Sequence, residues 1–190
     1  MIILIISDGG LNINERNTLD AILLTKNISY IDGIKIDIYL TKDNYFVVAN
    51  SNNLNDFTLS NKKINEVNYD YLRKVKFPSH IFKYYIPTLD EVLKKYTIRK
   101  KLILNLHFVN NINVNDALNN LLKIMSKYLY DYYFIMEGID YDTNDKYLKS
   151  KMLSKKDYIY LDNINDNINN IYIITKYPKK IYNTLLFRQN

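Results

Sequence analysis

The chain has 190 residues, which is enough for one domain over residues 1–190 that buries most of its apolar surface without disulfide or metal staples. It contains no cysteine, so a disulfide scaffold is excluded and we expect a reducing, cytoplasmic location. The formal charge is +6, but Asp and Glu are interspersed with Lys throughout, which indicates a generally basic surface more than a site for anionic partners.

The first predicted strand is an apolar run at residues 2–6 that ends in Asp8, Gly9 and Gly10. A continuous apolar run is typical of a parallel strand covered on both faces. This run is far too short to cross a bilayer and lacks the basic flank of a signal peptide, so no transmembrane or export segment is expected. A helix follows, with Asn17 as its expected N-cap.

Residues 32–51 predict two strands joined by a tight turn. Isoleucines at every second position make one face of the first strand apolar, and the same period places Lys35 and Asp37 together on the other face. Polar residues 41–44 supply the turn, and aromatic and β-branched residues at 45–48 begin the second strand.

Later segments alternate between helix and strand. Thr88 and Glu91 form a capping box that starts a helix, because each side chain bonds the other residue's free backbone N–H. The remaining predicted elements are a helix at 68–75, a strand at 101–107, a helix at 114–130, a strand at 132–136, a helix at 142–153, strands at 158–161 and 171–178, and a helix at 181–187. This alternation predicts a parallel α/β architecture.

Several of these segments resemble the glycerophosphodiester phosphodiesterase family of TIM-barrel phosphodiesterases. The family pattern G-I-E-x-D-V-x-x-T-K-D-G-x-x-V-V-x-H-D is similar to residues 33–51, where Asp37 is kept. The family motifs I-P-T-L-x-E-V-L, L-N-I-E-I-K and I-I-T-D-x-P are similar to residues 86–93, 102–107 and 173–178. Its H-R-G and P-E-N-T motifs are similar to residues 8–10 and 15–18.

The resemblance implies a (β/α)8 barrel with parallel strands alternating with helices. A complete barrel takes about 250 residues, and residues 162–170 are too few for the missing strands and helices. We therefore expect a shortened or incomplete TIM-type barrel. Lost units would leave exposed strand edges, which a protein partner or a second copy of the chain would cover.

The resemblance also implies a divalent metal held by carboxylates at strand ends, two catalytic histidines and an arginine that grips phosphate. Lys35 and Asn105 stand where the family has metal-binding Glu, while Asp8 and Asn50 stand where it has His. An ion pair between Lys35 and Asp37 would fill the vacated space. The leading hypothesis is a catalytically degenerate protein without a cofactor, which binds a protein or a phosphate-containing ligand.

The candidate ligand-binding residues are Gly9, Gly10, Lys35, Asn50 and Asn105. The two glycines follow a strand and would offer backbone N–H groups to a phosphate, although two glycines alone are a weak signal.

The alternative is an active metal-dependent phosphodiesterase with a rebuilt site. Asp8, Asp37, His107, Glu137 and Asp162 all fall at or just past predicted strand ends. Such a set would hold Mg²⁺ or Ca²⁺ through Asp37 and Glu137, with Asp8 and His107 as catalytic candidates and His107 as the general base. The simpler interpretation is that strand ends are polar because they meet solvent.

The lysines at 149, 151, 155 and 156 lie near two tyrosines and have the composition of a nucleic-acid patch. A solvated helix face explains them better, so no nucleic acid is expected.

Overall fold

The protein is described by a computed structural model. It describes residues 4–11, 16–56, 58–75, 85–97, 100–108, 112–136, 141, 144–161 and 172–189. The strands are β1 (Leu4–Asp8), β2 (Gly33–Leu40), β3 (Phe46–Val48), β4 (Lys101–His107), β5 (Tyr132–Ile135), β6 (Tyr158–Tyr160) and β7 (Tyr172–Thr175). The helices are α1 (Leu19–Leu24), α2 (Tyr69–Leu72), α3 (Leu89–Lys95), α4 (Val114–Met125), α5 (Lys146–Lys151) and α6 (Pro178–Gln189).

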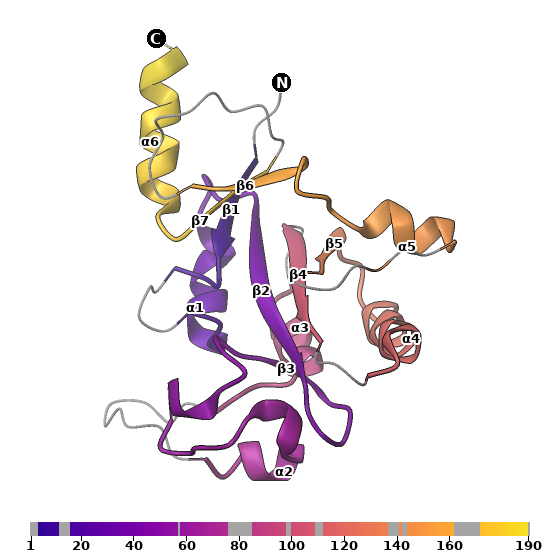
Figure 1. Ribbon diagram of the computed structural model, residues 1–190. Coiled ribbons are helices and arrows are strands. Elements are labelled where there is room, and N and C mark those ends of the chain that lie inside the picture. Colours follow the sequence, from indigo (N-terminus) through magenta and orange to yellow (C-terminus); the bar gives the residue numbers. More distant parts are fainter. Residues whose placement is uncertain are drawn as a thin grey trace.

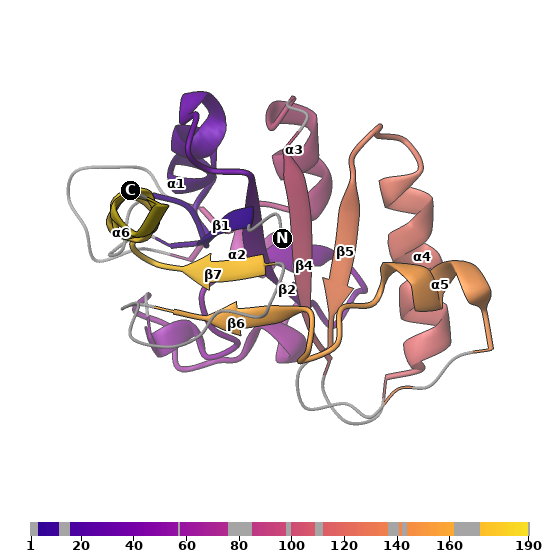
Figure 2. The same ribbon diagram turned by 90° about the horizontal axis from the view of Figure 1, so that it is seen from above.

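Six parallel strands form one curved sheet in the order β5-β4-β2-β1-β7-β6, and β3 pairs antiparallel with β2. Figures 1 and 2 show α1, α3, α4 and α6 around the outer side of this sheet. Within the described ranges no pairing joins β5 to β6, so the two edges stay separate. This half-barrel of parallel strands and helices confirms the α/β class and the shortened TIM-type barrel.

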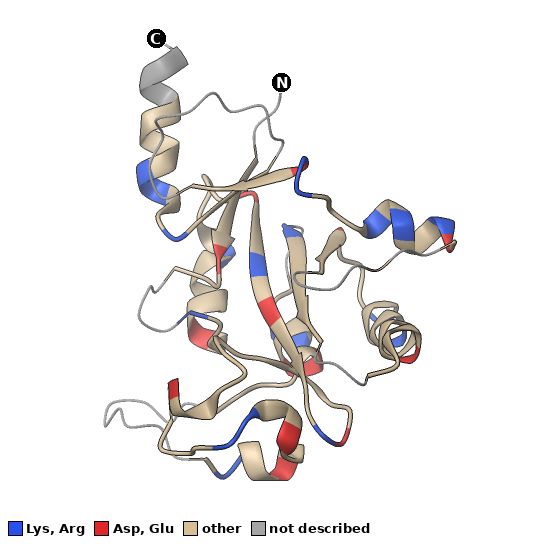
Figure 3. Ribbon diagram, in the orientation of Figure 1, with Lys and Arg blue, Asp and Glu red and all other residues tan. Residues whose placement is uncertain are grey.

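The inner face of the sheet changes from apolar to polar along the strands. Near the strand starts, Ile6, Ile103, Tyr158, Tyr172 and Ile174 belong to one buried apolar cluster. Towards the strand ends the inward positions are polar, and Figure 3 shows a basic segment followed by an acidic one along β2. The polar positions are thus held above a packed apolar layer inside the half-barrel.

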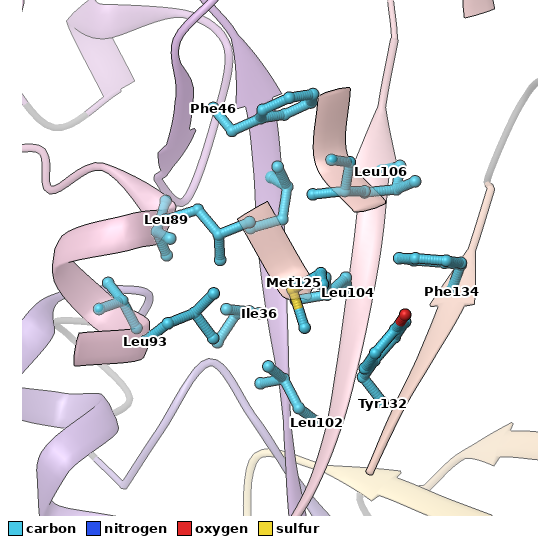
Figure 4. Close-up of a cluster of buried hydrophobic side chains, with 14 of the residues drawn as sticks. Ile36, Phe46, Leu89, Leu93, Leu102, Leu104, Leu106, Met125, Tyr132 and Phe134 are labelled. Carbon is cyan, nitrogen blue, oxygen red and sulfur yellow. The ribbon is translucent and has the colours of Figure 1, made fainter. Parts of the chain in front are cut away.

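The outer face of β2, β4 and β5 supplies the largest apolar cluster. It packs against α3 and α4, as Figure 4 shows for Ile36, Leu93, Leu104, Met125 and Phe134. Alternate residues of each strand point outward into this cluster, which is why the inward residues of the same strands are free to be polar. Burial of this face fixes the register of the strands, since a slip by one residue would exchange the two faces.

Two predicted helix details are wrong. The N-cap of α1 is Thr18, whose side chain accepts from the Ala21 N–H, because Asn17 has φ 61° and turns its side chain elsewhere. Helix α4 ends at Met125 and does not reach the predicted residue 130, and Leu129 is fully exposed. The chain leaves the helix there so that the Tyr130 hydroxyl can donate to the Leu93 and Tyr96 carbonyls at the end of α3.

The capping box of α3 is confirmed. Thr88 Oγ1 accepts from the Glu91 N–H at 3.1 Å, and the Thr88 N–H donates to Glu91 Oε2 at 2.8 Å. None of the helices in the described ranges is long and apolar enough to cross a membrane.

Candidate functional site

Polar inward residues of three neighbouring strands meet at the strand ends. The register places Asp8 beside Lys35 and Asp37 beside Asn105, with His107 two residues further along β4. Asp8, Lys35, Asp37 and Asn105 are each at most 5% exposed. The sheet therefore gathers four buried polar groups and His107 into one patch, which we call the strand-end cluster.

Lys35 lies at the centre of the strand-end cluster. Its Nζ is 2.8 Å from Asp37 Oδ1 and 3.2 Å from Asp8 Oδ1. The ring of Tyr160 on β6 covers the ammonium group, with its centroid 5.5 Å from Nζ. The ion pair between Lys35 and Asp37 expected from the alternation of β2 is present, and Asp8 extends it to β1.

Asp37 is enclosed by donors on both carboxylate oxygens. Besides Lys35, Asn105 Nδ2 lies 2.8 Å and His107 Nε2 3.0 Å from Oδ1. Asn17 Nδ2 donates to Oδ2 at 2.7 Å, and Asn17 Oδ1 accepts from the Asp37 N–H at 3.0 Å. This double contact explains the left-handed backbone of Asn17, which aims the amide into the cluster in place of capping α1.

Asp8 is shared between two cations. Arg16 Nη2 donates to Asp8 Oδ2, and Arg16 Nε donates to the Asp8 carbonyl at 3.1 Å. The Arg16 side chain is 16% exposed, so its guanidinium connects the buried cluster to the surface. Two carboxylates and two permanent cations thus balance each other within the cluster.

The charges shift the pKa of Lys35 and of Asp37 in the directions expected for an ion pair. Burial alone lowers the pKa of Lys35, but the negative charges of Asp37 and Asp8 outweigh it and raise this pKa above its ordinary value. Burial alone raises the pKa of Asp37, yet the hydrogen bond from His107 and the charge of Lys35 hold this pKa well below its usual range.

One oxygen of the strand-end cluster has no partner. Asn105 Oδ1 is buried and, over the described parts of the chain, receives no hydrogen bond. The amide cannot be turned to relieve this, because its nitrogen already contacts the Asp37 carboxylate. His107 beside it is stacked on Tyr39, with ring centroids 4.7 Å apart, and its side chain is 28% exposed. This side of the cluster offers an acceptor and an accessible ring.

The structure brings together Asp8, Lys35, Asp37, Asn105 and His107 from the predicted site residues. Asn50 is exposed just after β3, and none of the hydrogen bonds found among the described residues joins it to this group. Glu137 and Asp162 are outside the described residues. In the described ranges no three His, Asp or Glu residues are placed to hold a metal ion together.

Gly9 and Gly10 have packing roles beside the cluster. The Gly9 N–H donates to the Lys35 carbonyl at 2.8 Å, so this N–H is already used. A Cβ at Gly10 would lie 2.4 Å from the backbone of Ala21 in α1. The two glycines therefore bring α1 close to the end of β1, and phosphate binding by them stays a prediction.

Arg16 and Tyr160 were not among the predicted site residues, and Asn17 was assigned to the wrong role. Arg16 and Asn17 stand at the Glu and Asn positions of the family motif P-E-N-T, and this was the signal available for a site role. Tyr160 had no such signal, since its contact with Lys35 depends on how β6 packs against the sheet.

We expect acid to weaken the fold through Asp37. Because the pKa of this carboxyl is lower in the folded chain than in the unfolded one, the unfolded chain binds the proton more readily, and stability falls as pH falls. The stability that the Asp37 carboxylate contributes is fully present above about pH 5 and is lost progressively below this pH. Urea unfolding between neutral pH and about pH 3 should show this loss, and Asp37→Asn should flatten that part of the profile. An unchanged profile in the variant would contradict the assignment.

The comparisons with known proteins agree with the fold and the motifs. No curated protein matched the sequence. Solved structures that resemble the chain include a glycerophosphodiester phosphodiesterase from Parabacteroides distasonis, with 17% identity, a TM-score of 0.66 and 98% of each chain covered. The enzyme from Thermotoga maritima shows 14% identity and a TM-score of 0.64, over 97% of this chain and 99% of that one.

An Oleispira antarctica phosphodiesterase, solved with its product sn-glycerol-3-phosphate, has 15% identity and a TM-score of 0.68, with 97% of each chain covered. At these identities the structures show a shared fold. The model of the glycerophosphoryl diester phosphodiesterase family matches residues 14–170, which is most of the chain. The chain therefore belongs to the glycerophosphoryl diester phosphodiesterase family.

Proposed function

We propose that this chain is a catalytically degenerate member of its family that acts by binding. The observation that carries the proposal is the environment of Asp37, the carboxylate that the family pattern keeps. Lys35, Asn105 and His107 surround Asp37 Oδ1, and Asn17 takes Oδ2. With three donors on Oδ1 and one on Oδ2, a metal ion that bound this carboxylate would have to compete with the Lys35 ammonium group and with these hydrogen bonds.

The residues present do not fit the divalent metal on which this family typically depends. Hard cations bind charged oxygens, and the oxygens of Asp8 and Asp37 are paired with Lys35 and Arg16. A metal ion at this place would also meet the Lys35 ammonium at close range, where like charges repel strongly in a buried site. We therefore derive no reaction step through a metal.

The same cluster supports binding of a phosphate-containing ligand at the strand ends. Arg16 and His107 are partly exposed, and their nitrogens are of the kind that donate hydrogen bonds to phosphate oxygens. Barrels of this kind carry their sites at the strand ends, and the Oleispira relative was solved with a phosphate compound. The ligand would take the place of solvent above the ion pairs without disturbing them.

A protein partner is the other form of the proposal, and a different feature supports it. The gap between β5 and β6 contains a hollow whose apolar lining includes Ile135, Met136, Leu153 and Tyr158. An exposed apolar hollow at the place where the described residues of β5 and β6 do not pair with each other is suited to a protein surface or to a second copy of the chain.

Two measurements on the purified protein test the proposal. Hydrolysis of glycerophosphodiesters with Mg²⁺, Ca²⁺ or Mn²⁺ should be absent. Calorimetry with sn-glycerol-3-phosphate and inorganic phosphate should show binding that His107→Ala weakens and the exposed control Lys62→Ala leaves intact. Metal-dependent hydrolysis that Asp37→Ala abolishes would refute degeneracy. If neither hydrolysis nor phosphate binding is observed, the phosphate-ligand form of the proposal is refuted, and binding of a protein partner remains.

A further inference from the structure

Two buried carboxylates from neighbouring strands share one cation. Asp8 on β1 and Asp37 on β2 each place Oδ1 within hydrogen-bonding distance of the same nitrogen, Lys35 Nζ. All three residues are at most 5% exposed. Without a positive charge between them the two carboxylates would repel each other in a medium of low dielectric constant, so a cation at this place stabilises the sheet.

The two carboxylates are arranged as if a bound cation bridged them, but here the cation is the ammonium group of a side chain. A bound divalent cation does the same work in many proteins, because it collects carboxylate and carbonyl oxygens from different segments. Here the ammonium contacts the two carboxylates, and Arg16 supplies a second positive charge on the far oxygen of Asp8. Together the two side chains contribute the charge of one divalent ion.

We propose that Lys35 is a built-in cation that occupies the place of a divalent metal ion between Asp8 and Asp37, and that reversing its charge opens a divalent-cation site there. The inference goes beyond the proposed binding function, and it holds whether or not the protein binds a phosphate compound.

The unpartnered Asn105 Oδ1 is the second observation that points to a cation at this place. Its amide nitrogen is 2.8 Å from Asp37 Oδ1, so the free carbonyl oxygen of the same small side chain is buried close to the Asp37 carboxylate. Carbonyl oxygens are ligands for hard cations. With a carboxylate introduced at position 35, three carboxylates would border the space that the ammonium now fills, and a divalent ion together with Arg16 would restore neutrality.

The test compares Lys35→Glu with Lys35→Met and the wild-type chain. Lys35→Met is the matched control, because it removes the cation and keeps the length of the side chain without adding a ligand. Melting temperatures are measured in EDTA and then with excess Mg²⁺, Ca²⁺ or Mn²⁺, and calorimetry gives the stoichiometry.

We expect the wild-type melting temperature to be the same in EDTA and in each metal. Both variants should melt lower than wild type in EDTA. A metal at about 100 times its dissociation constant should raise the melting temperature of Lys35→Glu by about 5–10 °C, with one ion bound, and should leave Lys35→Met unchanged.

Two results would overturn the inference. One is a wild-type chain that binds one divalent ion in a manner lost in Asp37→Asn. The other is Lys35→Glu that gains no stability from any of the three metals, including a variant that stays unfolded in all of them. The wild-type titration needs no variant to fold, so the first result is always accessible.

Discussion

Asp37→Ala is expected to lower the free energy of unfolding by about 3–5 kcal/mol, the range seen when one partner of a buried ion pair is removed. The substitution leaves Lys35 buried with Asp8 as its remaining carboxylate partner, and it takes the acceptor away from Asn17 and Asn105. Those donors lose their bonds without regaining water, which adds to the loss. Urea unfolding at neutral pH measures the difference, with an unchanged slope as the sign of two-state behaviour.

The matched control is Asp131→Ala. Asp131 also pairs with lysines, Lys101 and Lys151, but its side chain is 47% exposed. An exposed pair contributes at most about 1 kcal/mol, so the control should stay close to wild type. Equal losses in the two variants would mean that the strand-end cluster is no more than an ordinary surface pair, and both the proposed function and the built-in cation would lose their basis.

The alternation of β2 was sufficient to predict which residues share the inner face. Isoleucines at every second position had to face the helices, so Lys35 and Asp37 had to lie together, and the ion pair followed from their charges. The capping box of α3 was equally local, because Thr88 and Glu91 bond each other across one turn. Such features depend only on the period of the element and on neighbours a few residues away.

Contacts between elements could not be predicted in this way. Local preference predicted Asn17 as a helix cap, but its amide instead bonds both the buried carboxylate and the backbone N–H of Asp37, while Thr18 caps the helix. The bond from Arg16 to Asp8 depends on the placement of residue 16 beside the end of β1, and the register of β1 against β2 decides that Asp8 reaches Lys35. No residue pattern within one segment contains that information.

The charges of the strand-end cluster balance without any bound ion. Buried carboxylates destabilise a barrel unless a cation neutralises them. Lys35 and Arg16 supply this neutralisation, since they balance Asp8 and Asp37 with charges that cannot dissociate. The cluster then contributes to the fold in the absence of any ligand, and the rest of the half-barrel is free to keep its packing.

Gly10→Ala is expected to destabilise the protein by roughly 2–6 kcal/mol, because backbone strain at a positive φ and overpacking each cost about 1–3 kcal/mol. Gly10 has φ 104°, and an added Cβ would lie 2.4 Å from the carbonyl carbon and oxygen of Ala21. The neighbouring Leu11 N–H donates to that same Ala21 carbonyl at 3.1 Å, so α1 cannot move away without breaking the bond. Thermal or urea unfolding gives the size of the effect.

Asn44→Ala separates the two causes of this loss. Asn44 also has a positive φ, 63°, but it lies exposed in the turn between β2 and β3. An alanine at this position has the strained backbone but no clash with a neighbouring helix, so we expect the free energy of unfolding to fall by about 1–2 kcal/mol. If Gly10→Ala were no worse than Asn44→Ala, close packing of α1 would not be the reason for Gly10. A folded Gly10→Ala that lost phosphate binding alone would instead support the phosphate-binding role predicted from the sequence.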